Sequence, residues 1–441
     1  MPEIKNTFTQ GKMNKDLDER IVPNGQYRDA MNIQVSTSEG SDVGTVQNIL
    51  GNSIMNNRGE VIIPSGYECV GSIADEKNDT LYSFVTNDTN SAIVEYAKDG
   101  AASPVLVDLN QGVLNFSAGD IITGINIIDE FLLWTDGVSE PKKINIERCK
   151  SGSGTDLSTH TQLVVNGTNT GISITEEHIT IVKKKPLRPL SVKINPADPS
   201  DKKPLFEKIF PRFSYRYRYE DGEYSAFAPF TDVVFNSEYP IDQNSSTLYD
   251  ENTAYDTKEP YNSGMINMIE SIELYDFVSS EMPKDVTQID VLYKQENSSV
   301  VYVVEIIKNT DAEWSANGIG GQLSNYKGKF TIESENIYAA VPTNQLLRSW
   351  DNVPKTAKAQ EITGNRIVYG NYTQGYDLTI ASPKVIADYK LRHPSFELPY
   401  IEGGLPSVKS QRNYQLGVVY GDEYGRETPV FTSTDSSVVI P

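Results

Sequence analysis

Short apolar runs separated by polar turns mark the region between residues 67 and 182. Residues 81–85 (LYSFV) form one such run, which ends at the polar turn of residues 86–88. Residues 93–96 (IVEY) form the next run, which ends at residues 98–100 (KDG). Apolar segments of this length between Asn, Asp and Gly turns are typical of strands, so the pair predicts a β-hairpin.

The same plan recurs at two further places. In residues 121–146, isoleucines lead to the run 131–134 (FLLW), the turn 135–137 (TDG) and the strand 143–146 (KINI). Far downstream, residues 362–371 pass from a polar lead-in to IVY and a Gly-Asn turn. Repeated runs of this kind predict small β-meanders, as in the blades of a propeller, although short strands with polar turns also describe β-sandwiches.

Aromatic residues alternate with polar ones in residues 213–219 (FSYRYRY), which predicts a strand with one aromatic face. Residues 414–420 (YQLGVVY) repeat the alternation. A polar turn follows each segment, and a proline lies ten residues after the last tyrosine in the first copy and nine in the second. We interpret both as one strand pair of a sandwich that resembles fibronectin type III modules, with strands at 289–293 and 300–307 completing the first copy.

The composition narrows the possible partners. The chain of 441 residues has a formal net charge of −21, so its surface repels nucleic acid and anionic membranes. This charge suits a channel through which DNA slides without sticking, and it equally suits simple solubility. No window approaches the ~20 continuous apolar residues of a membrane span, and the N-terminus shows no signal-peptide pattern. The two cysteines, Cys69 and Cys149, are expected to be buried free thiols of a protein assembled in a reducing cytoplasm.

Candidate chemistry is absent from the sequence. The three histidines, at 160, 178 and 393, have no metal-ligand spacing, which predicts surface or structural roles. The turn SGSGT at residues 151–155 lacks the lysine of a phosphate-binding loop and is not a nucleophile elbow. No motif marks one of the many close carboxylates as a glycosidase pair. The sequence therefore predicts no enzyme activity, no cofactor and no metal.

The opening segment, residues 8–32 (FTQGKMNKDLDERIVPNGQYRDAMN), is polar, punctuated by Gly and Pro, and suited to contact other protein. Together with residues 42–51, residues 135–141 (TDGVSEP) and residues 365–376 (NRIVYGNYTQGY), it resembles the tail nozzle (tail tube B-like) proteins of bacteriophages. Within that group the resemblance is to the muzzle proteins of crAss-like phages.

The resemblance implies a hexameric ring below the portal and its adaptor ring, which extends the channel for the genome and ejected proteins. It implies a propeller-like domain combined with other β-domains, and an opening segment that makes assembly contacts. The positions that would make them are Gly11, Asp16, Pro23, Tyr27, Arg28 and Asn32. For Arg28 the alternative is an ion pair with a carboxylate of its own subunit.

The predicted fold class is mainly β, a propeller-like β-meander domain with fibronectin type III-like β-sandwich modules. The expected parts are 1–60 as an N-terminal assembly arm, 61–185 as propeller-like blades, 186–345 as a fibronectin-like sandwich with a long polar loop, 346–382 as a return to the propeller, and 383–441 as the start of a second fibronectin-like module. Such a sandwich needs about seven strands, so either the chain is a fragment or cleaved product of a longer protein, which we favour, or another segment supplies the missing strands.

Two segments within these parts have open interpretations. Residues 183–204 carry five prolines and seven lysines or arginines, which predicts an extended connector. Its lysines are expected to face solvent, with phosphate contact as the alternative. The polar loop of residues 236–264 is either functional or disordered.

The leading functional hypothesis is a virion structural protein of the phage tail, made in the host cytoplasm. Its partners would be copies of itself, the portal-adaptor ring, other tail proteins, and DNA and proteins in transit. The alternatives are a carbohydrate-binding or hydrolysing tail protein and a bacterial surface adhesin. The missing signal pattern counts against the adhesin.

Overall fold

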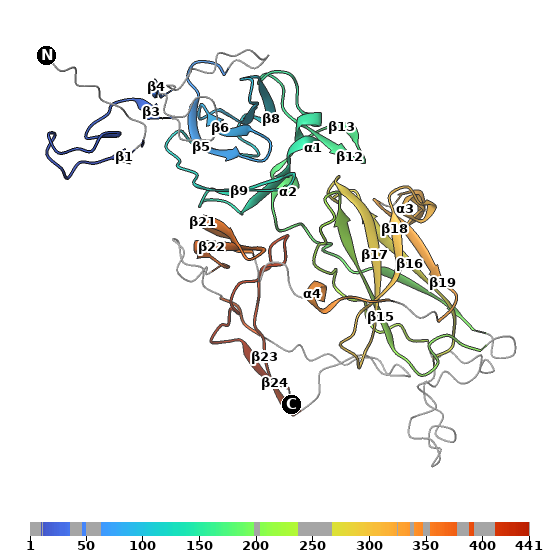
Figure 1. The fold of residues 1–441 in the computed structure, drawn as a ribbon. Coiled ribbons are helices and arrows are strands. Elements are labelled where there is room, and N and C mark those ends of the chain that lie inside the picture. Colours follow the sequence, from blue (N-terminus) through green and yellow to red (C-terminus); the bar gives the residue numbers. More distant parts are fainter. Residues whose placement is uncertain are drawn as a thin grey trace, which may run out of the picture. The chain divides into compact units, whose positions relative to one another are not determined.

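The computed structural model describes residues 10, 12–35, 46–49, 63–197, 203–236, 267–323, 325–335, 339–346, 353–376, 388–391 and 411–440. The chain divides into two compact units, residues 1–58 and residues 59–441 (Figure 1). Nearly all of the predicted polar loop, from residue 237 onward, lies outside the described residues.

The first unit contains two short strand pairs. Strands β1 (Lys12–Met13) and β2 (Gln26–Tyr27) pair in parallel, and β3 (Ile33–Val35) pairs antiparallel with β4 (Val46–Asn48). None of the hydrophobic clusters formed by described residues includes a side chain of this unit. Its described part is held by backbone pairing, turns and polar side-chain contacts.

The second unit begins with an antiparallel four-stranded meander in the order β5-β6-β7-β8. Its strands are β5 (Glu68–Asp75), β6 (Thr80–Thr86), β7 (Asn90–Tyr96) and β8 (Ala102–Leu109). Strand β7 begins at Asn90, two residues past the predicted turn, and Ser91 pairs with Thr86 across the hairpin. The hairpin predicted from residues 81–96 is confirmed.

A three-stranded sheet follows, with β10 (Phe131–Thr135) between β9 (Gly124–Ile128) and β11 (Lys142–Asn145). Trp134 of β10 is fully buried and its ring meets that of Phe84 at 5.5 Å in an edge-on contact, so the sheet shares a core with the meander. The next elements are α1 (Ile146–Gly152), the hairpin of β12 (Gln162–Val165) and β13 (Thr168–Ser173), and α2 (Glu176–Ile179).

Two sheets of a sandwich come next (Figure 1). One sheet has the order β14-β16-β19 and the other β15-β17-β18-β20. Their strands are β14 (Ser191–Pro196), β15 (Pro211–Tyr219), β16 (Ile269–Ser279), β17 (Val286–Gln295), β18 (Tyr302–Lys308), β19 (Tyr326–Ile332) and β20 (Ala339–Ala340). Both sheets contribute to one core, which includes Phe213 and Phe277. Short helical segments lie at Ala312–Ser315 (α3), Gly321–Leu323 (η2) and Thr343–Leu346 (α4).

Two strand pairs complete the second unit. Strands β21 (Thr356–Thr363) and β22 (Arg366–Thr373) form a hairpin, and β23 (Arg412–Gln415) pairs with β24 (Ser437–Ile440). The hairpin turns through Gly364 and Asn365, both at positive φ (53° and 57°), as a two-residue turn of type I′ requires. Strand β21 lies against β9 and β10.

The mainly β fold class is confirmed. Within the described residues the sheets form no closed propeller, and the finer propeller and fibronectin assignments stay predictions. The alternating strand at 213–219 is present as β15, but its polar face is buried too: Ser214 and Arg216 are only 0% and 3% exposed. The second alternating segment is not one strand, because β23 ends at Gln415 and the chain continues through isolated bridges such as Val418 with Phe431.

Two expectations about single residues are wrong. Lys183, at the start of the predicted connector, is buried instead of facing solvent. Cys149 is buried as expected, but Cys69 is exposed. Both errors arise because packing between distant segments decides burial, and local composition does not record it.

Candidate functional site

The opening segment folds on a turn that brings its two ends together. The amide of Gln26 donates to the carbonyl of Pro23 at 3.0 Å, and Gly25 between them has φ 96°, which only glycine adopts readily. Across the parallel pair, Asn14 donates from its side chain to Gln26 at 3.1 Å, and Gln26 donates to the side chain of Gln10 at 3.0 Å. The segment is therefore an ordered loop held by polar contacts.

The predicted contact positions are spread around this loop. Asp16, Pro23 and Asn32 are exposed, Tyr27 lies half-buried in β2, and Gly11 falls outside the described residues. Arg28 lies 3.8 Å from Glu19 of the same chain, which corresponds to the intramolecular alternative. With the two side chains 46% and 81% exposed, the pair contributes little stability and leaves Arg28 accessible.

Apolar side chains of the first unit also face solvent. Ile21 is 66% exposed and Met31 83%, and Met13 and Ile49 are exposed as well. Single exposed apolar residues are ordinary, but here several occur in a small unit whose described residues form no hydrophobic cluster. Such a surface is suited to be covered by another protein.

The motif at residues 135–141 forms a closed turn. The carboxylate of Asp136 accepts from the amides of Val138 and Ser139, both at 2.8 Å. The buried ammonium of Lys142 lies 3.6 Å from Asp136 and 3.0 Å from Glu176. Burial by itself raises the pKa of Asp136, but Lys142 and the hydrogen bonds outweigh burial, and the pKa is lowered. The aspartate is thus a charged structural member of the turn.

The strand β21, which pairs with β22 of the motif at residues 365–376, comes to the same place from far along the chain. The hydroxyl of Thr135 donates to the carbonyl of Ala357 in β21 at 2.5 Å. Gly124 of β9 leaves room for this strand, since a Cβ atom there would lie 2.9 Å from the amide nitrogen of Gln360. The structure therefore brings Thr135, at the start of the motif 135–141, against the strand that pairs with the motif at 365–376.

Arg426 links the segment of residues 422–426 to the turn at 135–141. Its guanidinium, 2% exposed, lies 2.6 Å from carboxylates of both Glu140 and Asp422. It also lies over the rings of Tyr424 and Tyr376, 5.0 and 5.7 Å from their centroids. These ion pairs hold the two segments in one arrangement, because removing any one partner would leave a buried charge without its counter-ion. Sequence reasoning missed Arg426, whose only local signal is Asp422 four residues before it.

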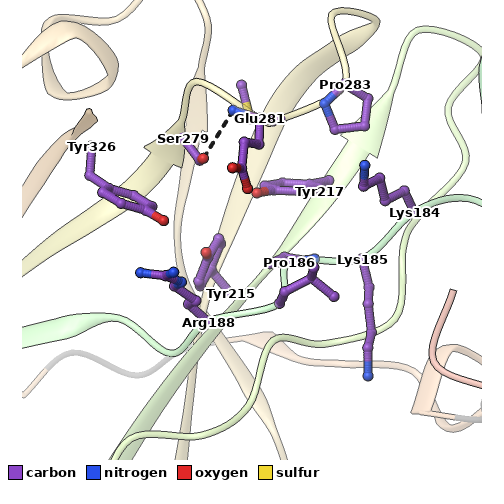
Figure 2. Close-up of a pocket in the computed structure, with 12 residues that line it drawn as sticks. Lys184, Lys185, Pro186, Arg188, Tyr215, Tyr217, Ser279, Glu281, Pro283 and Tyr326 are labelled. Atoms are coloured by element: carbon purple, nitrogen blue, oxygen red, sulfur yellow. Dashed lines mark hydrogen bonds between the residues drawn. The ribbon is translucent and has the colours of Figure 1, made fainter. Parts of the chain in front are cut away.

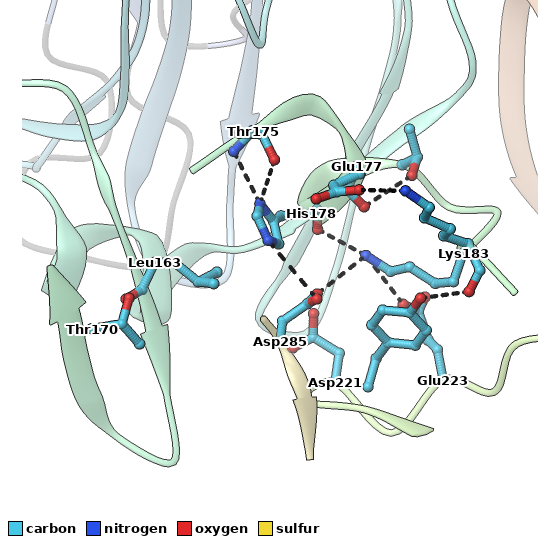
Figure 3. Close-up of polar contacts among 12 residues, drawn as sticks. Leu163, Thr170, Thr175, Glu177, His178, Lys183, Asp221, Glu223 and Asp285 are labelled. Atoms are coloured by element: carbon cyan, nitrogen blue, oxygen red, sulfur yellow. Dashed lines mark hydrogen bonds and ion pairs between the residues drawn. The ribbon is translucent and has the colours of Figure 1, made fainter. Parts of the chain in front are cut away.

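A second buried polar cluster surrounds Lys183 (Figure 3). Its ammonium donates to the carbonyl of His178 at 2.8 Å and lies 3.9 Å from carboxylates of Asp285 and Glu223. The hydroxyl of Tyr219 donates to the backbone carbonyl of Lys184, the residue after Lys183, at 2.6 Å. These contacts join α2 and the start of the predicted connector to strands of the sandwich.

Two groups in this cluster have shifted pKa values of opposite sign. Burial raises the pKa of Asp285 from 3.8 to about 6, although Lys183 opposes the shift. Its contribution to stability is therefore full below pH 3.8 and lost as the pH rises through 6. Burial lowers the pKa of His178 from 6.5 to about 4. The contribution of His178 to stability is full above pH 6.5 and lost as the pH falls through 4. The stability contributions of Asp285 and His178 therefore change in opposite directions with pH.

The described residues hold no group of three or more His, Cys, Asp or Glu side chains placed to bind a metal ion. Among them, no helix is long and apolar enough to cross a membrane. His160 and His178 are both tied to backbone groups by ring hydrogen bonds, which agrees with structural roles. His393 lies outside the described residues.

A protein-family model matches the first part of the chain. No curated protein matches the chain. The family model described as the crassvirus muzzle protein matches residues 3–255. This range includes the opening segment and the turn at 135–141, whereas the motif at 365–376 lies beyond it. Because the match covers more than half of its residues, the chain belongs to the crassvirus muzzle protein family.

Proposed function

We propose that this chain is a subunit of the muzzle ring in the tail of a crAss-like phage, where it extends the channel for ejection. The family match over residues 3–255 carries the proposal, since the family places the chain among the structural proteins of the phage particle. We propose a purely structural role, without catalysis.

The ring is proposed to be a homo-oligomer, with six subunits as the expected number. Head-to-tail contacts between identical subunits close naturally into rings. The net charge of −21 supports a lumen that repels DNA and lets it pass. The proposed neighbours are the portal-adaptor ring and other tail proteins, and the subunit is made in the host cytoplasm before it joins the virion.

The opening segment is proposed as the assembly arm. Its exposed apolar side chains, such as Ile21 and Met31, support this role because burial in an interface would stabilise the complex. The proposed contact positions are Gly11, Asp16, Pro23, Tyr27, Arg28 and Asn32.

The domain organisation is also a proposal. Strands β5–β8 and β9–β11 would be blades of a propeller-like domain in 61–185. The packing of β21 against β9 and β10 supports a return of the chain to that domain in 346–382. The sandwich in 186–345 is proposed to be fibronectin-like, and 383–441 to begin a second such module.

Mass measurement of tails isolated from virions tests the proposal. We expect the chain in a closed ring of identical copies, and a chain that stays monomeric inside intact virions would refute it. Replacing both Ile21 and Met31 by Ser tests the assembly arm. Ile121→Ser is the control, because Ile121 is 85% exposed and lies outside the arm. Loss of incorporation by the arm variant alone is the expected result, and equal incorporation would refute the arm.

A further inference from the structure

A pocket of about 180 Å³ lies between the segment after Lys183 and the sandwich (Figure 2). Lys185 and Arg188 come from that segment, Tyr215 and Tyr217 from β15, Tyr326 from β19, and Met282 from the turn after β16. Ligand pockets for drug-sized molecules have ~300–1,000 Å³. This pocket is smaller, so it fits a single side chain or a small ion.

The charge of the pocket differs from that of the chain. Three of the described residues that line it are basic and one, Glu281, is acidic, whereas the whole chain has 60 acidic and 39 basic residues. Lys184 is already paired, 3.2 Å from Glu423 and 3.6 Å from Glu177. Arg188 has no carboxylate within ion-pair distance among the described residues, and its guanidinium stands 5.6 Å from the ring centroid of Tyr326. The exposed Arg188 is therefore available to an anion.

The walls of the pocket supply a hydrogen-bond donor. Tyr215 and Tyr217 are each 3% exposed, and their rings lie 5.8 Å apart. Burial raises the pKa of Tyr215 to about 12, so its hydroxyl keeps its proton at neutral pH. A neutral tyrosine hydroxyl has one proton, which it can donate to a guest.

The segment that carries Arg188 is held in place on both sides. Before it, Lys183 is buried among carboxylates and the carbonyl of Lys184 accepts from the hydroxyl of Tyr219. After it, Leu190 belongs to the sandwich core. Pro186 and Pro189 restrict the backbone between these anchors. A site that is ordered before binding loses less entropy when it binds.

We propose that this pocket binds one carboxylate side chain of an extended acidic segment on a second copy of this chain, with Arg188 as the residue that recognises it. A guanidinium binds a carboxylate in bidentate geometry, which explains an arginine here. A second copy is the partner because two surfaces of net charge −21 repel each other unless a basic site meets acidic groups. This inference rests on the proposed function, which requires self-assembly.

The first experiment tests the chemistry of the pocket without assembly. Fluorescein-labelled hexaglutamate is titrated against the purified chain and followed by fluorescence anisotropy. We expect Arg188→Glu to raise the dissociation constant about tenfold or more, and Arg188→Lys to raise it less. The matched control is Arg412→Glu, which makes the same charge change at another exposed arginine. Native hydrogen exchange in β15 confirms that the variants are folded.

Other outcomes of this titration overturn the proposal. No binding to the wild type, or equal binding by Arg188→Glu and Arg412→Glu, would show that the pocket is not a carboxylate site. Labelled oligo-dT serves as the nucleic-acid probe. If it binds with the same dependence on Arg188, the site recognises phosphate and the peptide proposal is wrong.

The second experiment tests the partner by sedimentation velocity. We expect the wild type and Arg412→Glu to self-associate and Arg188→Glu to shift toward monomer. If Arg188→Glu assembles like the wild type, the second copy is not the occupant, while the proposed ring stands. If the wild type and the assembled tail both show a monomer, the ring and the second-copy assignment fail together, whatever the titration shows.

Discussion

Arg216 and Asp290 form an ion pair inside the sandwich, and its removal has a predictable effect. Their side chains are 3% and 2% exposed, and the guanidinium donates to the carboxylate at 2.9 Å. The guanidinium also lies 3.8 Å from the ring centroid of Tyr224, and Asp290 accepts a second hydrogen bond from Gln288 at 2.7 Å. Replacing Arg216 by Ala leaves Asp290 buried with one neutral donor.

The loss of one partner from a buried ion pair costs about 3–5 kcal/mol. Since each 1.4 kcal/mol is a factor of ten, amide exchange in β15 and β17 should accelerate by about a hundredfold to several thousandfold. Hydrogen exchange with mass spectrometry is the suitable assay, because it resolves the sandwich from the rest of a chain with several cores. The sandwich should respond, whereas the core around Trp134 should keep its protection.

Arg212→Ala is the control on the same strand. Arg212 also pairs with a carboxylate, that of Glu296, but the side chains are 27% and 47% exposed. An exposed pair of this kind is worth about 1 kcal/mol or less. If Arg216→Ala and Arg212→Ala accelerate exchange equally, burial does not govern the strength of the pair and the reasoning is refuted.

A double replacement separates the ion pair from the space it fills. Arg216→Met with Asp290→Leu removes both charges, so part of the loss, about 2 kcal/mol, should be recovered. About 1–3 kcal/mol should remain, since Gln288 loses its acceptor. A double variant as unstable as Arg216→Ala would show that shape, and not unpaired charge, determines the cost.

Three further predictions concern the other described parts of the second unit. Urea unfolding at several pH values separates the two groups. The Asp285→Asn variant retains His178, so its free energy of unfolding should decrease as the pH falls from 6.5 to 4. The His178→Gln variant retains Asp285, so its free energy of unfolding should increase as the pH falls from 6 to 3.8. A thiol reagent should modify Cys69 alone in the native chain and both cysteines in urea, because burial raises the pKa of Cys149 to about 12. Gly124→Ala should accelerate amide exchange in β21 about tenfold or more, since the new methyl would lie 2.9 Å from its backbone.

Each of these measurements has a contradicting result. Parallel pH profiles of the two variants would refute the assigned shifts of Asp285 and His178. Native modification of Cys149 at the rate of Cys69 would show that its site opens readily. Gly375→Ala is the control for Gly124→Ala, since nothing lies within 4 Å of the added methyl, and equal effects of the two would exclude a role for close packing.

Local patterns predicted individual strands well. The hairpin of β6 and β7 follows from two short apolar runs and an Asn-Asp turn, and β15 follows from the tyrosine alternation. The alternation did not predict that the polar face of β15 is buried as well. On that face Arg216 contacts Tyr224 and Gln345. A strand's sequence shows which side chains share a face, but coverage of that face depends on other segments.

The candidate site was only partly accessible from the sequence. The opening segment and the turn at 135–141 stood out by resemblance, but Arg426 did not. Its partner Glu140 is 286 positions away, so no local spacing could connect them. Lys183 was misassigned to a solvated connector because lysines are rarely fully buried unless paired, and the pairing groups of Asp285 and Glu223 lie in other segments.

The sequence by itself determined the mainly β class, the acidic charge, the turns and the family. These properties depend on residue type and short spacing, which the chain carries wherever it folds. Only the tertiary structure decided that β21 packs on β9 and that Arg426 pairs with Glu140. It also decided that Arg188 lines a pocket together with three tyrosines. Each of these contacts joins residues whose proximity is set by the path of the whole chain, because burial and charge pairing are properties of packed segments and not of one segment alone.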